Sequence, residues 1–342
     1  MKTTRCTFHL LGFILLALCA RGQAAEPYHF LKQIPIGTDG GWDCLSVDSA
    51  SHRLYVSHAV RVVVIDTQTD QVVGEIGDTP GAHAIAVAPQ LGRVFTTNGK
   101  ENKVSVVDLG SLKTLAKVET EINPDTALFE PGRGEVYAFN GRSRSATVIE
   151  AGSGKVVATI PLGGKPEFAQ ADSPAGRVYV NIEDKNEVVV IDTKTHTVVG
   201  HWPIAPGTEP TGMDIDLAHH RLFLGCGNEK LIVIDSSNGH VVASLPAGGG
   251  IDGAAFDPGT QLAFTSNGRD GTVTIVHEDT PDKYTVVQTL KTERSARTMA
   301  VDPVSHKLYL PSARFEAAPA APGKRPPMVS GSFKLLVYEL VR

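Results

Sequence analysis

The stretch VVVIDTQTDQVVGEI (residues 62–76) recurs as VVVIDTKTHTVVGHW (residues 188–202), 126 positions later along the chain. That distance is three times 42, and related apolar runs occupy the positions between the two copies. Runs of the VVVID kind end at residues 66, 108, 150, 192, 235, 277 and 339, which gives spacings of 42, 42, 42, 43, 42 and 62. Self-similarity at a fixed period of this length indicates a repeat architecture.

Each repeat contains four short apolar runs. In the first repeat, a run around LYV (54–56) precedes VVVID, a VVGEI run follows it after a turn, and a Gly- and Ala-rich run opens many of the repeats. The runs are rich in Val, Ile, Thr and Tyr, which favours strands over helices. Asp, Thr, Asn and Gly between them are typical of tight turns. We therefore predict four antiparallel strands per repeat, as in one blade of a propeller.

The first three strands of this unit occur seven times, but the last set, ending in LLVYELVR (335–342), has no outer strand after it. The segment YHFLKQIPIG (28–37) is a strand without an assignment. We predict an all-β fold, a seven-bladed β-propeller whose ring is closed by this N-terminal strand in blade seven. The Pro- and Ala-rich residues 311–332 are an insertion in the last blade and are expected to form an extended loop.

The first 25 residues differ in kind from the rest. A basic start precedes the apolar run FHLLGFILLALCA (8–20), and small residues follow. This pattern predicts a secretory signal peptide, 1–25, cleaved between Gly22 and Ala25, and a single propeller domain, 26–342, in the periplasm or outside the cell. A lipoprotein with Cys19 as the lipidated residue remains an alternative. No other segment is apolar enough to span a membrane.

The charge of the mature chain argues against general nucleic-acid binding. Cleavage would leave 29 basic residues against 37 acidic ones, a net charge of −8, which repels phosphate backbones. Two cysteines would remain, Cys44 and Cys226, so the fold does not depend on a disulfide framework, although one bridge stays open. Blades two and three have a local excess of basic residues, namely Arg93, Lys100, Lys103, Arg133, Arg142 and Arg144. Scattered surface charge also explains these residues.

The innermost strand of each propeller blade lines the central channel. Aligning the repeats at the acid of the first turn, or its equivalent, gives one polar residue per blade, five positions earlier. These residues are Asp43, His83, Asp125, Glu167, Thr211, Asp252 and Arg297. We predict that they form a ring at the channel mouth that binds a solute or a cation, since converging carboxylates need a cation or an arginine beside them. A wet channel wall that only holds ordered water is the alternative.

A second column comes from the end of the second strand in each blade. It consists of His58, Asn98, Asn140, Ile182, Cys226, Asn267 and Ser312. We include its histidine and asparagines as candidate ligand-binding residues at the same mouth, although Asn-Gly pairs also simply form turns. Cys226 has the alternative of being a small buried apolar residue. Trp42, beside Asp43, either stacks on a ligand or packs between blades.

Several motifs of catalysis and cofactor binding are absent. The sequence contains no GxSxG, HExxH, CxxCH or P-loop pattern. Its Gly-rich runs join strands and do not open a helix. The sequence therefore carries no specific catalytic signature, and the cofactor stays unknown, with a divalent cation left open.

The runs VIDTKTHTVVG, VYVNIEDKNEVVVID and VIDTQTDQVVGEI resemble the YVTN-type β-propeller repeat. The resemblance covers residues 28–342, and with its signal peptide the chain is similar to exported YncE-like proteins. It implies a seven-bladed ring. The resemblance also implies DNA binding for some members of the family. Lactonases and the β-subunits of quinone-dependent dehydrogenases are related propellers. No motif, however, assigns a catalytic role from either group to a numbered residue of this sequence.

We expect a non-enzymatic binding or scaffold propeller. It would be a monomer and take an unidentified small solute or periplasmic protein at the channel mouth. A lactonase-like or metal-assisted hydrolase is the first alternative, with Asp125, Glu167 or Asp252 holding a cation or activating water and His83 carrying protons. DNA binding through a local patch is the second.

Overall fold

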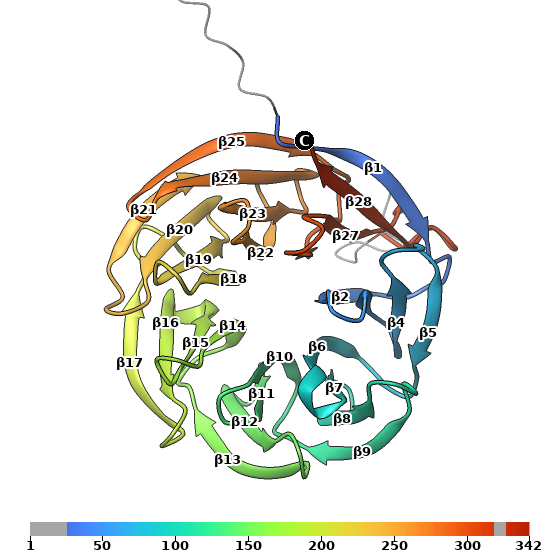
Figure 1. The fold of residues 1–342 in the computed structure, drawn as a ribbon, viewed down its shortest axis with the longest axis vertical. Helices are drawn as coiled ribbons and strands as arrows, with labels where there is room; N and C mark the ends of the chain where they lie inside the picture. The colour runs from blue at the N-terminus through green and yellow to red at the C-terminus, as the bar shows by residue number, and fades with distance from the viewer. Residues whose placement is uncertain (1–25, 318–325, 342) are drawn as a thin grey trace, which may run out of the picture.

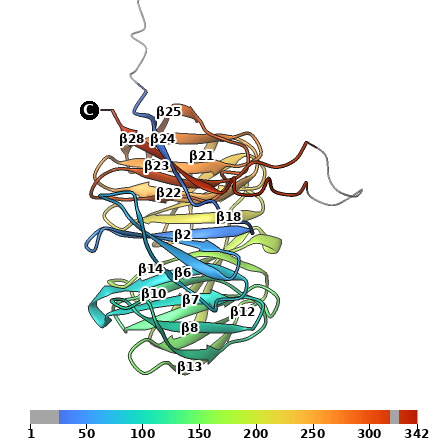
Figure 2. The same cartoon turned by 90° about the vertical axis from the view of Figure 1, so that its right-hand side faces the viewer.

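The computed structural model describes residues 26–317 and 326–341, and the signal-peptide prediction lies outside them. The described residues form seven four-stranded antiparallel sheets arranged around a central axis (Figure 1). This confirms the predicted all-β propeller of seven blades. Figure 2 shows the ring from the side, with β2, β6, β10, β18 and β22 running across the disc.

The strands keep the same order in every blade, from the axis outward. The innermost strands are β2 (Trp42–Asp48), β6 (Ala82–Ala88), β10 (Pro124–Glu130), β14 (Pro166–Asp172), β18 (Pro210–Asp216), β22 (Ile251–Asp257) and β26 (Ala300–Val301). The second strands are β3 (Arg53–His58), β7 (Arg93–Asn98), β11 (Glu135–Asn140), β15 (Arg177–Ile182), β19 (Arg221–Cys226), β23 (Leu262–Asn267) and β27 (Leu308–Ser312).

The third strands are β4 (Arg61–Asp66), β8 (Lys103–Asp108), β12 (Ser145–Glu150), β16 (Glu187–Asp192), β20 (Lys230–Asp235), β24 (Thr272–Thr280) and β28 (Lys334–Leu340). The outer strands are β5 (Val72–Ile76), β9 (Thr114–Glu119), β13 (Lys155–Pro161), β17 (Thr197–Pro203), β21 (Val241–Pro246), β25 (Lys283–Lys291) and, for blade seven, β1 (Tyr28–Pro35). Two short 3₁₀ turns, η1 (Pro89–Leu91) and η2 (Glu183–Lys185), lie in connections.

The N-terminal strand closes the ring, as predicted. β1 pairs antiparallel with β28 in register from Tyr28 opposite Leu340 to Pro35 opposite Lys334. The Tyr28 ring is buried and packs edge-on against Phe264 with centroids 5.3 Å apart. Its hydroxyl donates to the His306 carbonyl at 2.7 Å. The start of the chain is thereby joined to blades six and seven, which lie at its end.

The second and third strands are buried because neighbouring blades cover both faces of each sheet. Leu54, Tyr55 and Val56 on β3 are all fully buried, and Val62 to Ile65 on β4 are at most 4% exposed. Burial on both faces explains why these strands are continuous apolar runs rather than alternating ones. Most of the stabilising apolar contacts therefore lie between blades.

The insertion of the last blade packs against blade one where the structure describes it. Residues 318–325 lie outside the described part, while Phe315 and Met328 form an antiparallel bridge. The Trp42 ring lies 5.1 Å from the Phe333 ring and 6.1 Å from the Phe315 ring. Trp42 is thus a packing residue, the second of the two roles considered for it. Both remaining cysteines are free and buried.

Candidate functional site

The seven predicted ring residues line a single cavity, to which we refer as the channel pocket. Its volume is about 240 Å³, and every blade contributes to it. Its lining consists of Asp43, Cys44, His83, Asp125, Thr126, Lys165, Glu167, Phe168, Glu183, Thr211, Asp252 and Arg297. Alignment of the repeats alone therefore selected one polar side chain per blade that lines this cavity.

A β-bulge at the start of the inner strand orients the ring side chains of blades one to six. The register between β2 and β3 shifts between Trp42 and Leu45, and Asp43 lies within that interval. The ring residues of β6, β10, β14, β18 and β22 lie within equivalent shifts. A bulge leaves its residues out of the regular ladder and redirects their side chains. Arg297, in blade seven, precedes its short inner strand β26.

Polar side chains of the preceding blade hold the main chain of the ring residues. Thr298 Oγ1 donates to the Asp43 carbonyl at 2.7 Å, and Thr126 Oγ1 donates to the Glu167 carbonyl at the same distance, 2.7 Å. Equivalent bonds run from Thr97 to Asp125, from Asn181 to Thr211 and from Ser266 to Arg297. These bonds satisfy carbonyls that the bulges release and fix the pocket geometry before any ligand binds.

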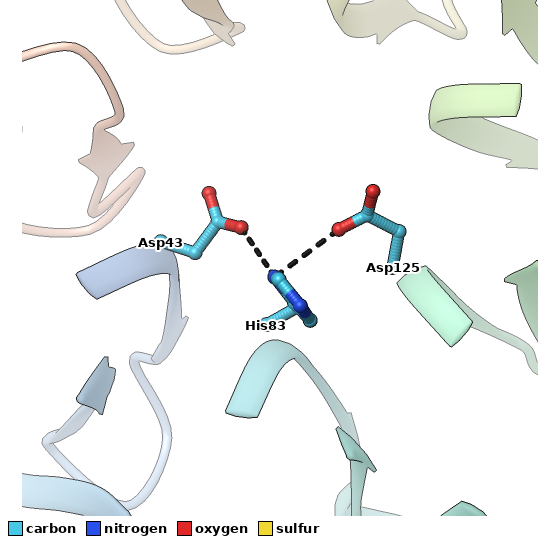
Figure 3. A group of neighbouring side chains, drawn as sticks. All are labelled: Asp43, His83 and Asp125. Atoms are coloured by element: carbon cyan, nitrogen blue, oxygen red, sulfur yellow. Dashed lines mark hydrogen bonds and ion pairs between the residues drawn. The ribbon is translucent and has the colours of Figure 1, made fainter. Parts of the chain in front are cut away.

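The His83 imidazole lies between two carboxylates, one from the blade before it and one from the blade after it (Figure 3). Its Nδ1 lies 2.7 Å from Asp43 Oδ2 and 3.2 Å from Asp125 Oδ1. Burial lowers the pKa of His83, but the hydrogen bond to Asp43 and the charge of Asp125 outweigh it and raise the pKa overall. One ligand atom from each of the three residues lies within 4.8 Å of the others, which makes them a candidate set for a metal ion. A cation here would take the place of the imidazole proton.

Arg297 closes the ring on the other side of Asp43. Its guanidinium pairs with Asp252, lies 3.4 Å from Asp43 Oδ1 and donates to the Trp42 carbonyl at 3.0 Å. Burial raises the pKa of Asp252, and the charge of Arg297 opposes this. The arginine therefore relieves the repulsion between carboxylates, as expected from the sequence.

Two charged residues of the pocket, Lys165 and Glu183, were missed by the repeat alignment. Lys165 Nζ lies 2.7 Å from Glu167 Oε1 and also pairs with Glu183. Burial raises the pKa of Glu167 to about 8 in spite of this lysine. Glu183 comes one position after Ile182 in the second column, and Lys165 two positions before Glu167. A search for charge in the positions flanking both columns would have found them.

The pocket contains more acids than bases. Asp43, Asp125, Glu167, Glu183 and Asp252 face three basic side chains, and burial also raises the pKa of Asp125. Burial is the main cause of the raised pKa values of Asp125, Glu167 and Asp252, and neighbouring carboxylates add to it, so the negative charge of this pocket is incompletely compensated. A bound cation would supply the missing compensation, so the pocket is electrostatically suited to a positively charged group.

Among the residues that the structure describes, no side chain of the channel pocket is an activated nucleophile. The Thr211 hydroxyl donates to the Ile251 carbonyl at 3.1 Å, and the Thr126 hydroxyl donates to the main-chain carbonyl of Glu167. Burial raises the pKa of the Cys44 thiol well above its ordinary value, which disfavours the reactive thiolate. This lining favours binding, or chemistry on a bound cation, over covalent catalysis.

The second column does not reach the channel mouth, which corrects our expectation for its members. His58, Asn98, Asn140 and Asn267 are fully buried within their blades. The amide of Asn267 donates to Thr272 and Thr274, both at 3.0 Å, on the neighbouring strand. Asn98 and Asn140 bond to Ser and Thr residues of the third strand in the same way. These amides terminate the sheet ladder, and the sequence could not distinguish this from a ligand contact.

His58 and Cys226 are buried for different reasons. The His58 ring stacks on Phe333 at 4.3 Å, and His58 Nε2 lies 2.7 Å from Thr38 Oγ1. Cys226 belongs to an apolar cluster with Leu224 and Ile232, the alternative considered for it. Neither residue is part of the channel pocket.

Comparison with known proteins identifies the fold and no family. No family model matches the chain, and no curated protein matches its sequence. A hydrazine synthase structure from Kuenenia stuttgartiensis matches with a TM-score of 0.71 at 18% identity, over 80% of this chain and 94% of that one. The Cps50 (Swd1) β-propeller domain of Myceliophteria thermophila matches with a TM-score of 0.73 at 12% identity, over 92% and 100%. A chain of the mitotic checkpoint complex matches with a TM-score of 0.74 at 12% identity, over 100% of both chains.

At these identities the likeness shows the β-propeller fold alone. The resemblance to YVTN-repeat and YncE-like proteins is confirmed neither by a family model nor by a sequence relative. Propellers commonly serve as interaction scaffolds, and the last of these neighbours is a member of a protein complex. Within residues 26–317 and 326–341, no helix has the length and hydropathy that a membrane crossing requires.

Proposed function

We propose that this chain is an exported, periplasmic or secreted propeller that binds a small, positively charged solute in the channel pocket and serves as a binding scaffold rather than an enzyme. The observation that carries the proposal is the convergence of five carboxyl groups from four blades on one preorganised cavity of about 240 Å³. That volume is below the range of drug-sized ligand pockets and suits a hydrated ion or a small amine. Export rests on the N-terminal sequence pattern.

The pocket charge makes the expected binding depend on pH. Glu167, with its pKa raised to about 8, loses its proton as the pH increases from 6 to 9, and His83, whose pKa is also raised, loses its proton at a higher pH than an ordinary imidazole. Each loss makes the pocket more negative. Cation affinity should therefore increase by roughly tenfold or more over this range, because one added charge within about 6 Å contributes on the order of 1–3 kcal/mol.

Calorimetric titration with Ca²⁺ and with 1,4-diaminobutane, at pH 6 and pH 9, tests the proposal. Asp125→Asn removes one carboxylate at nearly constant shape and should weaken binding by roughly tenfold or more. Glu75→Gln is the matched control, since Glu75 is an exposed carboxylate on the outer strand β5, and it should bind like the original chain. Equal affinity of the Asp125→Asn variant, or tighter binding at pH 6 than at pH 9, would contradict the proposal.

A metal-assisted hydrolase is the second candidate, and one observation favours it. Asp43, His83 and Asp125 each present a potential metal-ligand atom within 4.8 Å of the other two. A cation there would polarise a carbonyl or acidify a bound water. In this arrangement His83 would be a ligand through Nδ1 instead of the proton carrier considered from the sequence. Hydrolysis of a lactone panel that requires a divalent ion and is lost in Asp125→Asn would favour this candidate over simple binding.

The DNA-binding alternative gains no support from the surface of blades two and three. Arg93 and Lys103 pair with Asp108 and Glu119. Arg133 and Arg144 pair with Glu135 and Asp184 in the same manner. Acids therefore accompany most of the basic residues that suggested a patch, and phosphate would have to compete with them.

A further inference from the structure

A second cluster of potential metal ligands lies far from the channel pocket, between blades five and six. It consists of Asp216 at the end of β18, His219 in the turn that follows, and Glu278 on β24, each with a ligand atom within 4.8 Å of the other two. Thr211, the pocket residue of the same strand, is five residues from Asp216, or roughly 17 Å along β18. The two sites are therefore separate.

Glu278 departs from the repeat at a position where the other blades carry small or apolar residues. In blades one to six, the residue after the VVVID-type run donates its N–H to a carbonyl in the turn between the first and second strands of its blade. In blades one to five this residue is Thr67, Leu109, Ala151, Thr193 and Ser236. In blade six it is Glu278, and the residue is 1% exposed. A carboxylate buried at this position requires a partner.

The protein supplies Glu278 with only weak partners. Its Oε1 lies 3.4 Å from His219 Nδ1 and 3.5 Å from the Tyr284 hydroxyl, which donates instead to the Pro281 carbonyl at 2.6 Å. Its Oε2 is buried and has no hydrogen-bond partner among the described residues. The group is short of positive charge.

The nearest fixed cation is engaged elsewhere. Arg221 donates to the Pro281 carbonyl at 2.8 Å and pairs with Asp282 at 2.9 Å, which attaches the long β24–β25 hairpin to blade five. Its Nη1 donates to the carbonyls of His219 and His220. Arg221 thus positions the turn that carries His219 without bonding to the Glu278 carboxylate.

We propose that Asp216, His219 and Glu278 bind a divalent transition-metal ion of the zinc class, which joins the turn of blade five to the hairpin of blade six. Zinc bonds of about 2.0–2.2 Å to imidazole nitrogen and carboxylate oxygen, at tetrahedral angles, place ligand atoms about 3.4 Å apart. His219 Nδ1 and Glu278 Oε1 already have this separation, 3.4 Å. Asp216 Oδ2, now 2.6 Å from Nδ1, would move outward as the metal replaces the proton between them.

One of the three proposed ligands is open to solvent. About a third of the His219 side chain is exposed, 35%, whereas Asp216 and Glu278 are buried. A water molecule can therefore complete a tetrahedral shell of three protein ligands. Nitrogen and oxygen ligands together favour zinc and its neighbours over magnesium or calcium, which prefer oxygen alone.

Titration of the EDTA-treated and dialysed mature protein with Zn²⁺, by calorimetry and by thermal unfolding, tests the proposal. Glu278→Ser introduces the residue that blade five has at this position, and His219→Gln changes an accessible turn residue, so that at least one folded variant is available. Each should lose one equivalent of Zn²⁺ or bind it at least about tenfold more weakly, and should lose the increase in Tm that Zn²⁺ produces in the original chain.

Two controls separate this site from other residues. His306→Gln alters a similar pair, His306 Nδ1 with Asp257 Oδ2 at 2.7 Å, which has no third ligand in the described structure, and it should leave Zn²⁺ binding unchanged. Asp125→Asn in the channel pocket should retain the zinc equivalent of this site. Unaltered stoichiometry and affinity in both Glu278→Ser and His219→Gln would overturn the proposal, as would no binding by the original chain at Zn²⁺ concentrations of about 100 µM.

Discussion

Replacement of Tyr28 by alanine should lower the free energy of unfolding by about 3–5 kcal/mol, the range for large aromatic side chains deleted from a core. Tyr28 is 1% exposed and packs against Phe264 of blade six. Its hydroxyl bond to the His306 carbonyl is lost as well. Since β1 is the outer strand of blade seven, the cavity lies where the two chain ends are joined. Denaturant unfolding followed by circular dichroism measures the effect.

His29→Ala provides the control on the same strand. Half of the His29 side chain is exposed, 52%, and its contact is a surface pair with Glu339. It should change stability by less than about 0.5 kcal/mol. If both variants unfold at the same denaturant concentration as the original chain, β1 does not hold the ring closed, and the closure deduced from the repeat count would be wrong.

Replacement of Arg297 by glutamine should cost about 2–3 kcal/mol. Removing one partner of a buried ion pair typically costs 3–5 kcal/mol, and the lower range applies because 36% of the Arg297 side chain is exposed. The variant leaves Asp252 and Asp43 without their shared cation. A double-mutant cycle with Asp252→Asn measures the coupling, and the second substitution should restore part of the lost stability.

The loss should increase with pH. Burial raises the pKa of Asp252 in the folded protein, and removal of Arg297 raises it further. A carboxyl group whose folded pKa exceeds its unfolded value destabilises the fold more as the pH increases from the unfolded value to the folded one. Arg297→Gln should therefore be closest to the original chain at or below the ordinary aspartate pKa of about 4 and furthest from it at neutral pH. A loss that is independent of pH would show that Arg297 acts through packing alone.

The repeat determined most of what the sequence predicted correctly. The runs ending at Asp66 and Asp192 established the period, and a missing outer strand at the end of the chain identified β1 as its replacement. The ring from Asp43 to Arg297 followed from the same alignment, because equivalent positions in a closed array must lie at equivalent depths. The sequence did not indicate the bulges that turn these side chains inward, since a bulge depends on pairing with the next strand.

The sequence-based predictions were wrong or incomplete where neighbouring blades determine the environment of a side chain. Asn267 and His58 are polar residues of the kind expected at a channel mouth. In the fold, however, Asn267 is bonded to the neighbouring strand and His58 stacks on Phe333. Lys165 and Glu183 belong to positions outside the aligned columns, and only folding brings them beside Glu167. Glu278 carries no signal in the sequence, because its significance depends on Asp216 and His219, which are distant from it along the chain.

The sequence by itself determined the number of blades, the order of their strands and the identity of the residues nearest the axis, because period and hydrophobic pattern are local properties that add up around a ring. Only the tertiary structure decided which polar groups are exposed in the channel pocket, which are paired, and that Glu278 is buried beside a histidine and an aspartate. Burial and electrostatic compensation depend on atoms from several blades at once, and no single repeat contains that information.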